Sequence, residues 1–313
     1  MTPTATSDPD PINLVRLAGP LTGERIPVGE RYLDIDLTGP DDAEVVLLVA
    51  GLGMHRTAWP PELLTELHAA GYRTLAADNR DTGRSSVLPG GLAGIQRTPD
   101  GIPVAVYALQ DLAADLVQVL DHLEVGRAHV VGVSMGGMIA QRLALGWPQR
   151  VASLHLLMTT TGDWSVGLPH PEARWVLTRD PAPDLDAYVA AELAAAEVIG
   201  SPGHVDTGRV RALAHAQWER GVHPEGTARQ LAAILADGDR TAALAEITSP
   251  TLIVHGTADR LIDISGGRAL SAAIPGARYL EVPGLGHDLP ADLLAGIVPE
   301  LLATMAAGRQ RAG

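Results

Sequence analysis

The chain has 313 residues, of which 46% are hydrophobic and 19% charged, a composition that predicts a globular core domain with an insertion and excludes wholesale disorder. Its 37 acidic and 23 basic residues give a formal net charge of −14, which disfavours binding to nucleic acid or to an anionic membrane surface. Because the chain has no cysteine, a disulfide framework, a thiolate-bound metal and a cysteine nucleophile are all excluded.

The N-terminal segment, residues 1–25, is expected to be a disordered leader. It starts with a run rich in Pro, Thr and Asp and lacks the basic start and apolar core of a signal peptide. No stretch of the sequence reaches the roughly 20 apolar residues that would span a bilayer. We therefore expect a cytoplasmic protein with no membrane partner.

Short apolar and β-branched runs, bounded by Gly, Pro or Asp, predict buried strands along the rest of the chain. Helical patterns, with apolar residues three and four positions apart, separate several of these runs at residues 61–70, 109–123 and 136–145. This alternation predicts an α/β fold with a mostly parallel, doubly wound sheet covered by helices on both faces. The strands are expected at residues 45–50, 73–77, 128–133, 151–158, 251–255 and 277–281.

The alternation stops between residues 162 and 244. Three Ala- and Leu-rich helical stretches follow one another there, interrupted by six prolines that end helices and form turns. This segment is expected to be a helical cap inserted into a core domain made of residues 26–161 and 245–313. A last helix is predicted near residues 292–305.

The pentapeptide Gly132-Val133-Ser134-Met135-Gly136 is a candidate nucleophile elbow. A strand pattern leads into it and a helical pattern leaves it, as expected for a serine exposed on a sharp strand-to-helix turn. Glycine on each side lets the strand and the helix approach without Cβ clashes. Ser134 is therefore the predicted nucleophile, and the alternative is a glycine-rich turn with an incidental serine.

A serine hydroxyl requires an adjacent base, and the base requires a third group that fixes its tautomer. His287, in a glycine-rich loop after the last predicted strand, is the candidate base, with a surface histidine as the alternative. Asp259, directly after the strand at 251–255, is the favoured acid, and Asp163, after an earlier strand, is its competitor. Asp288 adjoins His287 in sequence and is poorly placed to orient it.

Two backbone N–H groups must face the oxyanion of an acyl-transfer intermediate. Met135, after the nucleophile, supplies one. The second is expected from residues 51–54 (Gly-Leu-Gly-Met, called the oxyanion loop below), from Leu52 or, as a fallback, from Met54. The same loop superficially resembles a dinucleotide fingerprint, but Arg56 occupies the position where close helix packing requires a small residue, so NAD binding is not expected.

His55, Trp59 and Trp164 are candidate residues of a substrate pocket. Each has a simpler explanation, a solvated histidine in the first case and core packing for a tryptophan. No His and carboxylate spacing typical of a metal site is present, and the chemistry requires neither metal nor cofactor.

Together the motifs resemble the α/β-hydrolase superfamily over residues 30–306. Residues 78–85 (Asp-Asn-Arg-Asp-Thr-Gly-Arg-Ser) are similar to its turn after an early strand, and residues 250–256 to its acid-bearing strand. The Asp-Thr-Gly form of that turn is similar to a bacterial subgroup that includes aclacinomycin methylesterase-like hydrolases. The sequence departs from the common pattern at Ala50, where many relatives have histidine, and this leaves the support of the oxyanion loop open.

The sequence therefore predicts a serine esterase that cleaves a small-molecule carboxylic ester through an acyl-enzyme intermediate. A serine nucleophile argues against the dehalogenases and epoxide hydrolases of the superfamily, which use aspartate. On the same triad, a cofactor-free perhydrolase or haloperoxidase, a lactonase and a C–C bond hydrolase remain alternatives. A ligand-binding receptor that keeps the fold without turnover is an alternative of a different class.

Overall fold

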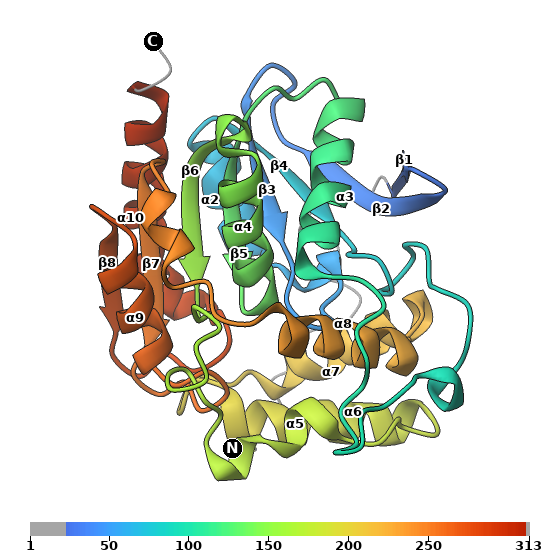
Figure 1. Cartoon of the computed structure of the whole chain (residues 1–313). Coiled ribbons are helices and arrows are strands. Elements are labelled where there is room, and N and C mark those ends of the chain that lie inside the picture. The colour runs from blue at the N-terminus through green and yellow to red at the C-terminus, as the bar shows by residue number, and fades with distance from the viewer. Residues whose placement is uncertain (1–22, 311–313) are drawn as a thin grey trace, which may run out of the picture.

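An eight-stranded sheet forms the centre of the protein in the computed structural model, which describes residues 23–310 (Figure 1). Its strand order is β1-β2-β4-β3-β5-β6-β7-β8. The pairs β1–β2 and β2–β4 are antiparallel, and all the other pairs are parallel. The strands span Glu24–Val28 (β1), Arg31–Thr38 (β2), Glu44–Val49 (β3), Tyr72–Ala77 (β4), Ala128–Val133 (β5), Val151–Leu157 (β6), Thr251–Gly256 (β7) and Arg278–Val282 (β8).

Helices cover both faces of the sheet, which confirms the predicted fold class (Figure 1). Alternate residues of one strand point to opposite faces, so Val46 and Leu48 of β3 join one core and Leu47 and Val49 join the other. The first core includes α2 and α10, and the second includes α3, α4 and α9. These helices span Pro61–Ala69 (α2), Leu109–His122 (α3), Met135–Gly146 (α4), Ser265–Ala273 (α9) and Ala291–Gln310 (α10).

The C-terminal helix α10 is long and apolar enough, by length and composition alone, to cross a membrane. In the structure it packs against α2, β6 and β7. Its residues Leu294, Ile297, Leu301 and Met305 are buried in the core on that side of the sheet. This packing accounts for its apolar face as part of the core.

The structure adds an N-terminal hairpin, β1–β2, that the sequence patterns did not predict. The hairpin begins at Glu24, inside the segment 1–25 expected to be a leader, while residues 1–22 lie outside the described part of the chain. In β2, Asp34 and Asp36 alternate with apolar residues and are themselves buried. Both carboxylates bind the buried Arg56, so charged residues in β2 lie at positions that a periodicity argument assigns to solvent.

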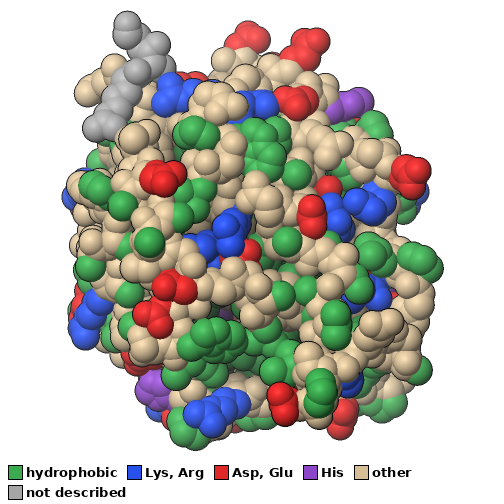
Figure 2. All heavy atoms as spheres, in the orientation of Figure 1, with side chains coloured by type: hydrophobic (Ala, Val, Ile, Leu, Met, Phe, Trp, Pro, Cys, Tyr) green, Lys and Arg blue, Asp and Glu red, His purple; other side chains and the backbone are tan. Residues whose placement is uncertain are grey.

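Four α-helices between β6 and β7 lie beyond the ends of the parallel strands, in the segment expected to form the cap (Figure 1). We call residues 162–244 the cap. Acidic and basic side chains are interspersed over the face of the molecule shown in Figure 2, which carries no extended basic patch of the kind that binds nucleic acid. The cap helices span Trp175–Thr178 (α5), Leu185–Ile199 (α6), Thr207–Arg220 (α7) and Pro224–Asp237 (α8).

Buried ion pairs join the cap to the turn at residues 78–85. Arg229 of α8 donates two hydrogen bonds of 2.8 Å to the carboxylate of Asp81. Arg220 of α7 binds Asp78 and, at 3.0 Å, Asp34. Removing one partner of a buried ion pair leaves an uncompensated charge, which costs about 3–5 kcal/mol. These buried ion pairs therefore hold the cap on the core, because separating the two would leave buried charges without partners at a large cost in free energy.

A chain of buried polar side chains crosses β5 and β6 on the α10 side of the sheet and should make stability fall with acid. The Ser153 hydroxyl lies 2.7 Å from His129 Nδ1 and 2.8 Å from His155 Nε2. Burial lowers the pKa of His155 from 6.5 to about 3, and burial also lowers the pKa of His129. Below pH 6.5 the unfolded chain therefore binds more protons at these histidines than the native protein does, so unfolding is favoured as pH falls.

We expect the free energy of unfolding to decrease between about pH 6 and pH 4, by up to about 1.4 kcal/mol per pH unit for each of the two histidines. Well above pH 6.5 both rings are neutral in the native and the unfolded state and contribute almost no pH dependence. Urea unfolding at a series of pH values checks this, with His155→Leu as the comparison. The variant should show a shallower slope, and parallel slopes for the two proteins would contradict the assignment.

Candidate active site

Ser134 stands between β5 and α4 with φ 56° and ψ −123°, a backbone conformation that is strained for a residue with a side chain. Such strain costs about 1–3 kcal/mol and persists only where the surroundings hold it. Here the Ser134 N–H donates to Leu157 O at 3.0 Å, and the Thr159 hydroxyl donates to Ser134 O at 2.8 Å. Residues of β6 and of the loop that follows it thus fix the turn.

The two glycines of the pentapeptide are needed for this geometry. A Cβ atom on Gly132 would lie 2.3 Å from Gly136 O, and one on Gly136 would lie 2.0 Å from Val49 O. Both positions are tighter than any real contact of a Cβ atom, and the blocking atoms are backbone. The helix α4 can therefore pack directly on β5 and β3 only because neither residue carries a side chain.

His287 is hydrogen-bonded to Asp259, with 2.8 Å between Nδ1 and Oδ2. Asp259 is 3% exposed, and its Oδ1 accepts 2.9 Å hydrogen bonds from the N–H groups of Leu261 and Ile262. Burial acts to raise the pKa of Asp259, but the charge and hydrogen bond of His287, together with those of His255, outweigh it and hold that pKa well below its ordinary value. Asp259 is therefore an ionised partner for the ring.

The competing acids have other partners. Asp163 accepts the N–H of Ser165 at 2.8 Å and forms a local turn, with no hydrogen bond to His287. The Asp288 carboxylate accepts the N–H of Ser201 at 3.0 Å and the Ser201 hydroxyl at 2.5 Å. Asp288 thus links the loop at residues 284–288, called the histidine loop below, to Ser201 of the cap and does not orient the ring.

The described part of the chain contains no hydrogen bond between the Ser134 hydroxyl and the His287 ring. The two residues follow β5 and β8, whose carboxyl ends lie at the same edge of the parallel sheet. In enzymes without substrate, such hydrogen bonds are often long and tighten only in the complex. The structure therefore places Asp259 and His287 in contact, with Ser134 at the same edge of the sheet.

The oxyanion loop lies directly beside Ser134, since a Cβ atom on Gly51 would be 3.9 Å from the Ser134 hydroxyl oxygen. Within the loop, the Met54 N–H donates to Gly51 O at 3.2 Å, and the Gly53 N–H donates to Gln230 Oε1 at 2.9 Å. Among the described residues, Leu52 N–H makes no hydrogen bond. Within the oxyanion loop, the Leu52 N–H is therefore available to bind an oxyanion, whereas the Met54 N–H is already hydrogen-bonded.

The three candidate pocket residues lie in different surroundings. His55 is 3% exposed, and its pKa is lowered to about 4, chiefly by burial. Trp59, also 3% exposed, packs in the core that contains α2 and α10. Trp164, by contrast, is 59% exposed on the loop after β6. Trp59 is thus a core residue, whereas Trp164 lies largely in solvent.

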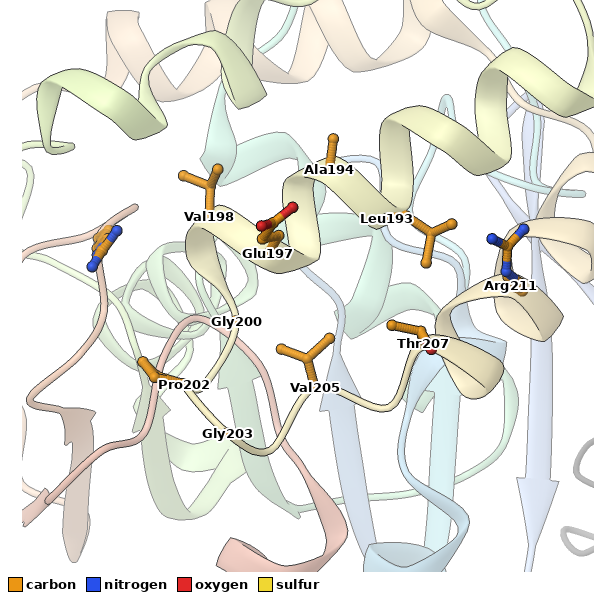
Figure 3. Close-up of a pocket in the computed structure, with 11 residues that line it drawn as sticks. Leu193, Ala194, Glu197, Val198, Gly200, Pro202, Gly203, Val205, Thr207 and Arg211 are labelled. Carbon is orange, nitrogen blue, oxygen red and sulfur yellow. The ribbon is translucent and has the colours of Figure 1, made fainter.

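A groove of about 640 Å³ lies in the cap, and none of those three residues lines it. In Figure 3, Leu193 of α6 faces Val205 and Thr207 of the following segment across the groove. The groove borders the histidine loop, because it is lined by Gly200, whose carbonyl carbon would lie 2.4 Å from a Cβ atom on Gly286. Among the described residues, no group of three or more His, Asp or Glu side chains is arranged to hold a metal ion.

Comparison with known proteins agrees with this architecture. The family described as alpha/beta hydrolase fold matches residues 44–292. Rhodomycin D methylesterase DnrP of Streptomyces peucetius is 32% identical over 81% of this chain and 88% of its own length. RutD of Variovorax paradoxus, named as a candidate carbamate hydrolase, is 33% identical over 82% of this chain and 89% of its own length.

Among solved structures, a hydrolase from Pseudomonas aeruginosa superposes with a TM-score of 0.70 at 27% identity, covering 92% of this chain and 99% of that one. The chain therefore belongs to the α/β-hydrolase fold family, as its sequence motifs predicted.

Proposed function

We propose that this protein is a serine esterase that hydrolyses a carboxylic ester of a small molecule, with Ser134, His287 and Asp259 as its catalytic triad. The observation that carries the proposal is the combination of a strained serine at the start of α4 with a buried Asp259–His287 pair at the same edge of the sheet. A methylesterase among its relatives supports an ester as the substrate class.

The chemistry follows from the positions of these groups. His287 Nε2 takes the proton of Ser134 as its oxygen attacks the ester carbonyl carbon, while Asp259 holds Nδ1 protonated and stabilises the charged ring. The N–H groups of Leu52 and Met135 stabilise the oxyanion that forms. His287 then gives its proton to the departing alcohol, which leaves an acyl group on Ser134.

In the second half of the reaction, a water molecule attacks the acyl-enzyme as His287 accepts its proton. The tetrahedral intermediate collapses, the carboxylic acid leaves, and the proton returns from His287 to Ser134. The same two steps would cleave a carbamate, the substrate class in the name of a second relative. Carboxylic esters and carbamates of the same alcohol should therefore be assayed side by side.

Labelling with a fluorophosphonate probe tests the proposal. The probe loses fluoride and phosphonylates a serine only when a base activates it, so one equivalent should attach to Ser134 and abolish hydrolysis of 4-nitrophenyl acetate. The modified peptide is located by mass spectrometry. Absence of labelling in folded protein would contradict the proposal and favour a receptor that keeps the fold without turnover.

A further inference from the structure

The oxyanion loop follows Ala50, whose methyl side chain can form no hydrogen bond to support it. In this structure the support comes from elsewhere. Asn79, in the turn at residues 78–85, donates from its side-chain amide to Ala50 O at 3.0 Å. The Asp78 carboxylate accepts the N–H of Arg56, just beyond the loop, at 2.7 Å. The turn thus holds the chain on either side of the loop.

The loop itself is held by the cap. Gln230 of α8 is fully buried, and its Oε1 accepts the Gly53 N–H at 2.9 Å. Its Nε2 donates to Arg80 O and to the Thr82 hydroxyl, each at 2.8 Å. Because both donated bonds lie on the amine side and the accepted bond on the carbonyl side, the amide has one orientation that satisfies every partner.

This contact holds the central peptide of the oxyanion loop. Residues 51–54 form a β-turn closed by Met54 N–H and Gly51 O, with Gly53 at φ +62°. Glycine at that position allows the central peptide, between Leu52 and Gly53, to take more than one orientation. Gln230 binds the N–H of this central peptide and so holds the position of Leu52, whose own N–H belongs to the preceding peptide.

We infer that Gln230 is a positioning residue for the oxyanion hole, through which the cap helix α8 sets the direction of the Leu52 N–H. The inference rests on the proposed esterase function and deepens it. Gln230 touches the loop and not the reacting atoms, so its effect is on transition-state stabilisation. The cap thereby takes part in catalysis as well as covering the strand ends.

Gln230→Met, which keeps the length of the side chain and removes all three hydrogen bonds, tests this. A displaced oxyanion donor should lower kcat for 4-nitrophenyl acetate by about 10- to 100-fold with little change in KM. Affinity for an aryl trifluoromethyl ketone, which forms a tetrahedral adduct with the serine, should fall by a similar factor. Gln230→Glu, which can still accept the Gly53 N–H, should retain more activity than Gln230→Met.

Gln141 provides the matched control. It is also a fully buried glutamine that links core and cap, since it accepts a 2.9 Å hydrogen bond from Arg240 and donates to Thr160 O at 3.1 Å. It makes no hydrogen bond to the oxyanion loop in the described structure. Gln141→Met should lower the melting temperature as Gln230→Met does while leaving kcat within about threefold of the parent.

The outcomes separate the inference from the proposed function. If the parent protein hydrolyses the ester through Ser134 but Gln230→Met keeps kcat within threefold, or Gln230→Glu is as inactive as Gln230→Met, the positioning role is wrong. If the parent shows no Ser134-dependent hydrolysis, the proposed function itself fails. Should Gln230→Met not fold, Thr82→Val withdraws one partner of the same amide, and an unchanged kcat in that variant would overturn the inference.

Discussion

Replacing Ser134 with alanine is expected to lower kcat for 4-nitrophenyl acetate by about 10⁴- to 10⁶-fold. The substitution removes the atom that forms the acyl-enzyme, and the residual rate would come from the oxyanion hole and binding alone. Steady-state kinetics with the variant at high concentration measures the residual rate. Fluorophosphonate labelling of the same variant should be lost.

The fold should survive this substitution. The Ser134 hydroxyl makes no hydrogen bond among the described residues. Leu157 and Thr159 bind the backbone N–H and carbonyl oxygen of residue 134, which alanine also has. We therefore expect the free energy of unfolding to change by no more than about 0.5 kcal/mol. Turnover that persists in a folded Ser134→Ala protein would rule out the assigned nucleophile.

Replacing Asp259 with asparagine is expected to lower kcat by about 10⁴-fold. The amide can donate to His287 Nδ1, which favours the tautomer with the proton on Nε2, where the base must accept one. It also removes the negative charge that stabilises the ring once it is protonated. The pH dependence of kcat/KM should change as well, because the base then titrates without its carboxylate partner.

Asp163→Asn is the matched control for this prediction. Asp163 accepts the N–H of Ser165, a bond that an asparagine oxygen can also accept, and makes no hydrogen bond to His287. Its kcat should stay within about threefold of the parent. A large loss at Asp163 with full activity at Asp259 would reverse the assignment of the acid.

The central strands and their helices could be predicted from local patterns. The strand over residues 128–133 and the helix that starts at Met135 were expected within a residue of their observed bounds, because buried parallel strands are continuous apolar runs and helices repeat every three to four residues. The hairpin β1–β2 was not predicted, because charged residues interrupt the apolar pattern of β2. Its carboxylates are buried by pairing with Arg56, a residue that periodicity cannot connect with them.

The sequence by itself determined the fold class, the serine at the strand-to-helix turn, and the order of serine, acid and histidine along the chain, because each depends on neighbours only a few residues away. Only the tertiary structure decided between Asp259 and Asp163 as the partner of His287. It also revealed Gln230, 177 residues from Gly53, as the support of the oxyanion loop. Contacts of this kind form when packing brings distant segments together, and no local pattern of apolar and polar residues records which distant atoms will meet.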